Sequence, residues 1–187
     1  MIPARQILDW LDAKDRRDMA LAAALTGAVA LWRIGPAQAL PFALAGAVSL
    51  GIFRIDGRHR LIPDLLNLTL AAVGLVSLAL SIPPDLSRLA CAALLWLVTE
   101  LLRRISLRSG GRRLFGGGDV KLIAAAALWL SPLQMPSYLF AAALSGLAEA
   151  GWAALRPGGT RPHVIAFGRH LAPWLCLFAL AGPDLHI

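Results

Sequence analysis

Apolar residues in this chain come in long blocks, and short clusters of Arg, Pro and Gly separate the blocks. The blocks run for about 13 to 20 residues, close to the length a helix needs to cross a bilayer. Helices of a soluble domain would instead carry apolar residues on one face only. The pattern predicts an all-α, polytopic membrane bundle of six or seven transmembrane helices. The expected spans are residues 19–33, 38–54, 64–81, 87–102, 119–131, 136–155 and 166–182.

The composition agrees with a membrane protein, and the placement of charge predicts its orientation. Of the 187 residues 58% are hydrophobic and 16% are charged, against roughly 25% charged in an average soluble protein. The net charge of +7 is compatible with nucleic-acid binding. With a cytoplasmic N-terminus, however, all Lys and Arg residues except Arg33 and Arg88 lie on the cytoplasmic side. The charge therefore sets topology, and its expected partner is anionic lipid, with no nucleic acid.

The first 18 residues contain several charges and no apolar block. One interpretation is a helix on the cytoplasmic surface of the membrane, and the other is a frayed polar tail. The side chains available to enter the interface in the first case are Ile7, Leu8, Trp10 and Leu11.

Two polar stretches, Arg103–Gly118 and residues 156–163, are rich in Arg and Gly and predict mobile cytoplasmic loops. Neither resembles a linker between two domains. We therefore expect a single membrane-embedded domain over residues 1–187, with residues 1–18 as its cytoplasmic interfacial tail.

Asp56 and Asp119 lie at the ends of apolar segments, and the expected topology puts both at the cytoplasmic edge of the membrane. Ionisable groups at such positions are costly and suggest function. Asp56 falls at the C-terminal end of a helix, where the dipole disfavours a carboxylate. Its alternative role is a solvated loop residue paired with a neighbouring Arg. Asp119 follows three glycines that permit close approach of a substrate backbone, but it is also a good helix N-cap.

Other chemistries lack their residues. The sequence has no Gly-Lys-Ser/Thr loop for a nucleotide and no His-Glu-x-x-His for a zinc peptidase. Cys91 and Cys176 fall in predicted spans, far apart, and suit apolar packing better than a disulfide or a metal site. We therefore expect neither a metal nor a cofactor.

Two aspartate motifs resemble those of the prepilin peptidases, the membrane aspartic proteases that trim type IV pilin-like precursors. The family's first motif is an Asp, a basic stretch and Ile-Pro-Asn; the residues that match it are Asp56, Arg58, Arg60, Ile62 and Pro63. Asp64 replaces the usual Asn. The second motif, Gly-x-Gly-Asp-x-Lys-Leu, is matched in full by Gly116, Gly118, Asp119, Lys121 and Leu122. Near the C-terminus, Ile165-Ala166-Phe167-Gly168 resembles the family's Ile-Pro-Phe-Gly.

The resemblance implies that Asp56 and Asp119 are the catalytic pair. The residues expected around them, toward the substrate, are Asp64, Gly116, Gly118 and Lys121. It implies cleavage of the leader of a pilin-like precursor at the cytoplasmic face of the bacterial inner membrane. The chain is similar in plan to short Tad/Flp-type peptidases. It has no counterpart of the Cys-x-x-Cys-bearing domain of larger, methylating members, so methylation is not expected. The alternative is a non-catalytic membrane subunit or small transporter of a pilus system; the oligomeric state stays open.

Overall fold

The computed structural model describes residues 3–108, 116–155 and 166–182, and every regular element in these ranges is a helix. The elements are α1 (Ala4–Asp9), α2 (Ala13–Arg33), α3 (Pro36–His59), α4 (Asp64–Ala79), α5 (Ser87–Arg108), α6 (Gly117–Ala126), α7 (Gln134–Leu155) and α8 (Gly168–Ala181). The all-α prediction is confirmed. Each of the seven expected spans overlaps one of the helices α2 to α8, although α6 ends at Ala126, five residues before the end of the expected span 119–131.

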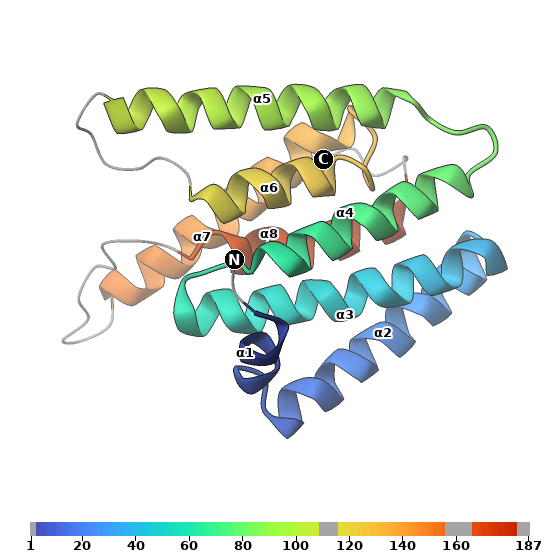
Figure 1. The fold of residues 1–187 in the computed structure, drawn as a ribbon, viewed down its shortest axis with the longest axis horizontal. Coiled ribbons are helices and arrows are strands. Elements are labelled where there is room, and N and C mark those ends of the chain that lie inside the picture. The colour runs from blue at the N-terminus through green and yellow to red at the C-terminus, as the bar shows by residue number, and fades with distance from the viewer. Residues whose placement is uncertain (1–2, 109–115, 156–165, 183–187) are drawn as a thin grey trace.

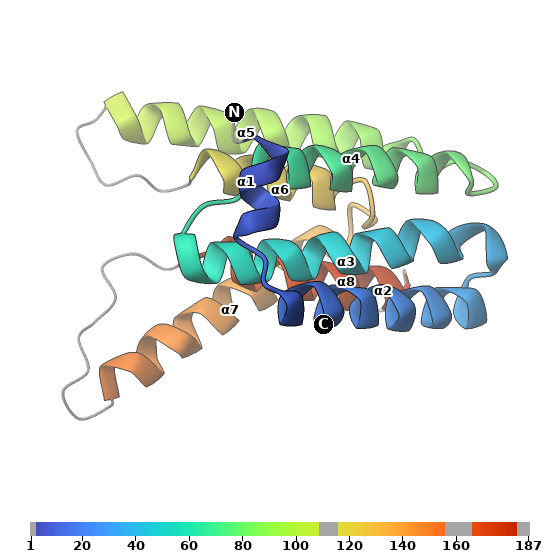
Figure 2. The same ribbon diagram turned by 60° about the horizontal axis from the view of Figure 1, so that its bottom comes forward.

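The helices form two layers that share a common core (Figures 1 and 2). Helix α6 packs against α4 and α5 in one layer, and α3 packs against α2 and α8 in the other. Contacts of α3 with α4 and of α6 with α8 join the layers, while α7 packs on α8. Fully buried side chains from four helices fill the space between them: Ile52, Leu70, Leu122, Leu171 and Phe178.

Two of the described helices, α3 and α7, are long and apolar enough to cross a membrane, and α4 is a shorter apolar helix. Large apolar side chains are also exposed along α2 and α5, for example Leu25 and Trp32 on α2 and Leu94 and Leu101 on α5. Exposed apolar patches of this extent are unusual on a soluble monomer and suit contact with lipid.

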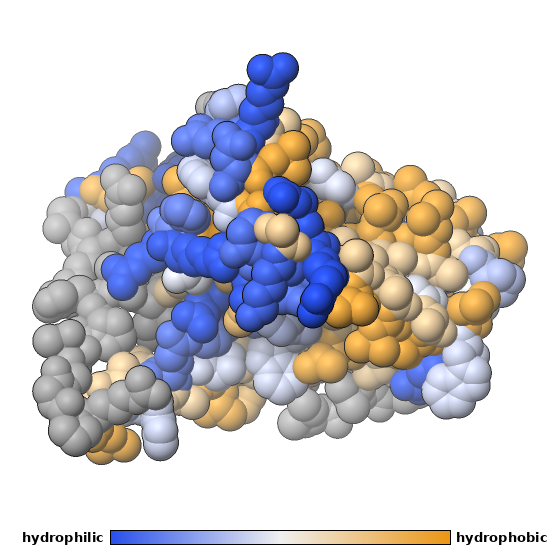
Figure 3. Space-filling view, turned by 90° about the horizontal axis from the view of Figure 1, so that it is seen from below, coloured by the Kyte–Doolittle hydropathy of each residue, from blue (hydrophilic) through white to orange (hydrophobic). Residues whose placement is uncertain are grey.

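Polar residues gather at one end of the bundle. The space-filling view shows hydrophilic side chains over the half that carries α1 and the start of α2, and mainly hydrophobic atoms over the other half (Figure 3). Helix α3 ends at this polar end, and α4, α6 and α8 begin there (Figure 1). The connectivity therefore brings Asp56 of α3 and Asp119 of α6 to the same end.

Two expectations about polar segments need correction. Residues 103–108 were expected in a loop but continue α5 as helix; residues 109–115, like the loop expected at 156–163, lie outside the described residues. The N-terminal segment is not a frayed tail, because Ile7 and Leu11 are buried against Ile55 of α3. Of its four apolar side chains, Leu8 is the one that stays largely exposed. Its contact with a membrane interface stays a prediction.

Candidate active site

Asp56 lies on the last turn of α3 and is buried, with 4% of its surface exposed. Its Oδ2 accepts a hydrogen bond from the backbone N–H of Arg169, in the first turn of α8, at 2.9 Å. The sequence identified an unfavourable position at the negative end of the α3 dipole. The structure supplies the compensation, because the positive N-terminal end of α8 faces the same carboxylate.

Gly168 makes this close approach possible. A Cβ atom added at Gly168 would lie 2.9 Å from Asp56 Oδ2 and would also overlap the side chain of Ile62. No side chain fits there without a shift of the neighbouring atoms. The glycine of the segment that resembles the family's C-terminal motif therefore has a physical role: it lets the first turn of α8 reach the aspartate.

Asp119 is anchored differently, by its own helix. It is the third residue of α6, and its Oδ2 accepts a hydrogen bond from the N–H of Gly116 at 3.2 Å. The N-cap interpretation of Asp119 is thus wrong by three residues, since Gly116 occupies the cap. Asn67 of α4 donates from Nδ2 to the carbonyl of Gly118 at 3.2 Å and fixes the peptide just before the aspartate.

Ile62 links the two aspartates. Its side chain packs against Gly168 beside Asp56 and against Gly118 beside Asp119, where an added Cβ would lie 2.9 Å from Ile62 Cβ. Gly168, which lies against Asp56 Oδ2, and Gly118, which precedes Asp119, therefore contact the same side chain. Residues separated by more than sixty positions in the chain are therefore brought together, as the two motifs predicted.

Asp64 and Lys121 form an ion pair with each other at the edge of this site. Lys121 Nζ lies 2.5 Å from Asp64 Oδ1, and both side chains are nearly half exposed. The resemblance implied that both residues lie around the catalytic pair. In the structure the two charges compensate each other.

The start of α8 is held by a second set of contacts. Arg169 Nη1 donates to Glu149 of α7 at 3.1 Å, and its guanidinium lies 5.4 Å from the centre of the Phe53 ring on α3. Nε2 of His170 lies 3.1 Å from the other oxygen of Glu149. These contacts tie α3, α7 and α8 together next to Asp56.

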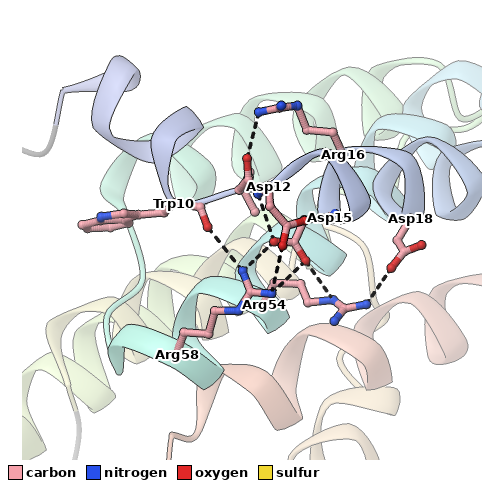
Figure 4. Close-up of polar contacts among 8 residues, drawn as sticks. Trp10, Asp12, Asp15, Arg16, Asp18, Arg54 and Arg58 are labelled. Atoms are coloured by element: carbon pink, nitrogen blue, oxygen red, sulfur yellow. Dashed lines mark hydrogen bonds and ion pairs between the residues drawn. The ribbon is translucent and has the colours of Figure 1, made fainter.

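Asp15 of α2 forms an ion-pair cluster with Arg54 and Arg58, the two arginines of α3 that flank Asp56 in the sequence (Figure 4). The Asp15 side chain is fully buried, and its two oxygens accept hydrogen bonds from Arg58 at 2.6 and 3.2 Å. Arg54 lies 3.6 Å from Asp15 and 2.7 Å from Asp18. Burial raises the pKa of Asp15, but the hydrogen bonds and positive charges of Arg58 and Arg54 outweigh it and hold the pKa below its ordinary value.

The sequence did not identify three of these positions as parts of the site: Arg169, Asn67 and Asp15. Arg169 acts through its backbone, and a hydrogen bond from the main chain leaves no signature in residue type. Asn67 has a weak signal, as an amide inside an apolar block. Asp15 has none, because it is one of four aspartates in a segment of mixed charge. No group of three metal-binding side chains occurs within the part of the chain that the structure describes.

A family model described as "Type IV leader peptidase family" matches residues 43–150, which is more than half of the chain. The chain belongs to this family. The matched range includes both aspartates, Asn67 and the Asp64–Lys121 pair. The start of α8 and the N-terminal aspartates lie outside it.

Curated relatives carry the name "Prepilin leader peptidase/N-methyltransferase". The chain is 34% identical to the one from Dichelobacter nodosus over 158 residues, covering 81% of this chain and 52% of the relative. It is 33% identical to the one from Dickeya chrysanthemi, covering 84% and 54%, and 32% identical to the one from Legionella pneumophila, covering 81% and 52%. The chain thus spans about half the length of these type IV leader peptidase relatives. No solved structure matches it.

Proposed function

We propose that this chain is an aspartic endopeptidase that removes the leader peptide of type IV pilin-like precursors. The observation that carries the proposal is the meeting of Asp56 and Asp119 at one polar end of the bundle, each carboxylate held by a backbone N–H. Membership of the type IV leader peptidase family gives the reaction class. Only the peptidase part of the relatives' name is proposed for this chain.

Asp56 and Asp119 would share one proton, because two nearby carboxyls resist ionising together. The ionised member takes a proton from a water molecule as the water attacks the scissile carbonyl. The protonated member hydrogen-bonds to the carbonyl oxygen and later gives its proton to the leaving amine. The residues of this chain supply all of these steps without a metal or cofactor.

The proposed orientation places the polar end in the cytoplasm and the apolar helices across the bacterial inner membrane in several passes. The distribution of basic residues supports it: Arg54, Arg58 and Lys121 lie at the end with the aspartates, whereas Arg33 ends α2 at the opposite end. Within the class of type IV pilin-like precursors, Tad/Flp-type precursors are the proposed substrates. Membrane lipids surround the apolar faces.

A cleft between α4, α5 and α6 suits the hydrophobic helix that follows the scissile bond of such a precursor. It has a volume of about 450 Å³, and its walls include Ala71, Ala92, Trp96 and Leu128. Its only charged walls among the described residues are the Asp64–Lys121 pair, which lies next to Asp119. A helix lying in this cleft would present its polar end to the aspartates, and the alanines would let its backbone approach closely.

A second cleft, between α2, α3 and α8, is larger, at about 600 Å³, but suits this substrate less well. Its charged lining residue, Arg33, lies at the end of the bundle away from the aspartates. Its lining residue nearest the active site is Phe53, and the guanidinium of Arg169 covers the ring of Phe53. We therefore assign the precursor to the α4–α5–α6 cleft and lipid to the other.

The test is a cleavage assay with purified protein in liposomes and a pilin-like precursor encoded near its gene. Wild-type protein should shorten the precursor, and Asp56→Asn and Asp119→Asn should each abolish the reaction while remaining folded. Substantial cleavage by either variant would refute the paired mechanism. An uncleaved precursor with a well-folded wild type would favour the non-catalytic membrane subunit or small transporter.

Matched substitutions test the choice of cleft. Ala92 and Ala22 are both half-buried and line one cleft each. Ala92→Leu fills the α4–α5–α6 cleft and should reduce cleavage about tenfold or more through a higher KM, whereas Ala22→Leu should leave it within about twofold. The reverse result would move the precursor to the cleft between α2, α3 and α8.

A further inference from the structure

Two arginines flank Asp56 on α3, two residues before and two residues after it. Two residues correspond to about 200° of rotation around a helix, so Arg54 and Arg58 point away from the side that carries Asp56. Asp56 faces α8, where it meets the N–H of Arg169. The arginines face the start of α2 (Figure 4). The last turns of α3 are therefore contacted on two opposite sides.

The contacts on the second side converge on Asp15. Its carboxylate binds Arg58 through both oxygens and lies in ion-pair distance of Arg54. Asp18 binds Arg54 at 2.7 Å, and Asp12 lies 3.8 Å from Arg58. Asp15 has no exposed surface, so water cannot replace these partners without movement of α2 or α3.

The residues before α2 extend this support to the end of α3. The ring of Trp10 stacks on His59 with 4.6 Å between ring centres, and the Trp10 carbonyl accepts a hydrogen bond from Arg58 at 3.4 Å. Ile7 and Leu11 pack against Ile55, the residue next to Asp56. Residues 7–18 thus contact successive residues of α3 on either side of the aspartate.

The position of Asp56 explains why such support matters. The last turn of a helix has carbonyl groups without helical partners, and it frays readily unless other contacts hold it. Misplacement of a catalytic group by about 1 Å can cost about a hundredfold in rate. The N-terminal segment lies outside the range matched by the family model.

We propose that Asp15 is a positioning residue: through Arg54 and Arg58 it fixes the turn of α3 that carries Asp56 for peptide hydrolysis. The proposal rests on the proposed function, in which Asp56 is catalytic. Asp15 itself does not touch the substrate. Its removal should slow the chemical step without weakening the binding of the precursor.

The first test is Asp15→Asn, compared with wild type in the cleavage assay and normalised to folded protein. We expect kcat to fall about tenfold with KM within about twofold of wild type, since the substrate site is intact. The matched control is Glu100→Gln on α5, which removes two ion pairs of 2.7 Å, with Arg103 and Arg104, that lie in a separate cluster. This control should change kcat by less than about twofold.

A second variant and a second readout cover the case in which Asp15→Asn folds poorly. Arg58→Lys keeps the charge but loses the two-point contact with Asp15, and should reduce kcat about threefold. Amide hydrogen exchange should be faster in residues 54–60 of both variants than in wild type, and unchanged in α6. Hydrogen exchange is measured without activity, so it tests whether Asp15 holds this turn of α3 even if the chain cleaves no precursor.

Two results would overturn the proposal. One is a kcat per folded molecule equal to that of Glu100→Gln in both variants, which would make the cluster an element of folding alone. The other is a rise in KM with kcat unchanged, which would place the N-terminal segment in precursor binding.

Discussion

The two aspartates at the polar end are supported in different ways. Asp56 lies on the last turn of a 24-residue helix and is buried. The first turn of α8 binds its carboxylate, and α1 and α2 contact its neighbours Ile55 and Arg58. Asp119 lies in the first turn of a 10-residue helix and is half-buried. Its carboxylate is held by one N–H of its own cap, and Asn67 fixes the peptide before it. We infer from this difference that, in the proposed reaction, Asp56 is the fixed carboxyl and the side chain of Asp119 is the one that adjusts to a substrate.

Among substitutions that keep both carboxyl groups, crowding around Asp56 predicts the largest effect. Gly168→Ala would place a methyl group 2.9 Å from Asp56 Oδ2 and force α8 or the aspartate to move. We expect cleavage to fall about a hundredfold, as for a displaced catalytic group. The measurement is kcat/KM with a pilin-like precursor.

Gly117→Ala is the matched control, because nothing lies within 4 Å of a Cβ added at Gly117. It should retain cleavage within about threefold, since Ala is tolerated in the first turn of a helix. If Gly117→Ala and Gly168→Ala reduced cleavage equally, the surroundings of Asp56 would be no more constrained than those of Asp119.

Removing each carboxylate should affect stability unequally. Asp56→Ala leaves the N–H of Arg169 without its buried acceptor, which costs about 1–3 kcal/mol in the free energy of unfolding. Asp119→Ala loses a bond at an exposed helix start and should cost about 1 kcal/mol or less. Thermal unfolding in detergent measures both. A larger loss for Asp119→Ala would make Asp119 the more firmly held member.

The sequence predicted the helical class and the meeting of the aspartates because both can be inferred from the length and number of the apolar blocks. Long apolar blocks define helices, and an even number of helices between two positions returns the chain to the same end. Asp119 was placed in a recognisable motif, and so was Gly168. The role of Gly168 was not predictable, because it depends on how closely α8 approaches Asp56.

The N-terminal segment shows what sequence patterns cannot supply. Arg54 and Arg58 were expected to set membrane topology, and Asp15 was one charge among many. Their pairing depends on how α2 packs along α3, which is set by contacts between residues far apart in the chain. Likewise, the polar character of residues 103–108 suggested a loop, but ion pairs between Glu100 and Arg103 and Arg104 stabilise α5 there.

Acid should weaken the support behind Asp56. Because the pKa of Asp15 in the folded protein is below its ordinary value of 3.8, its ionised form stabilises the fold. This contribution is fully present above the ordinary value and is lost as the pH falls through the lowered one. The difference in Tm between wild type and Asp15→Asn should be constant from about pH 7 to pH 5 and shrink below about pH 4. A difference that grows in acid would contradict the ion-pair assignment.

The smallest effect is expected at Asp64, on the side of Asp119. The Asp64–Lys121 pair is nearly half exposed, and pairs of this kind contribute about 0–1 kcal/mol to stability. Asp64→Asn should therefore change the free energy of unfolding by less than about 1 kcal/mol and cleavage by less than about threefold. The change frees Lys121 for an acidic group of the precursor, so KM should become more sensitive to salt than in wild type. A loss of cleavage above about tenfold would instead make Asp64 a third participant in the reaction, and the exposed side of the site would then be as constrained as the side of Asp56.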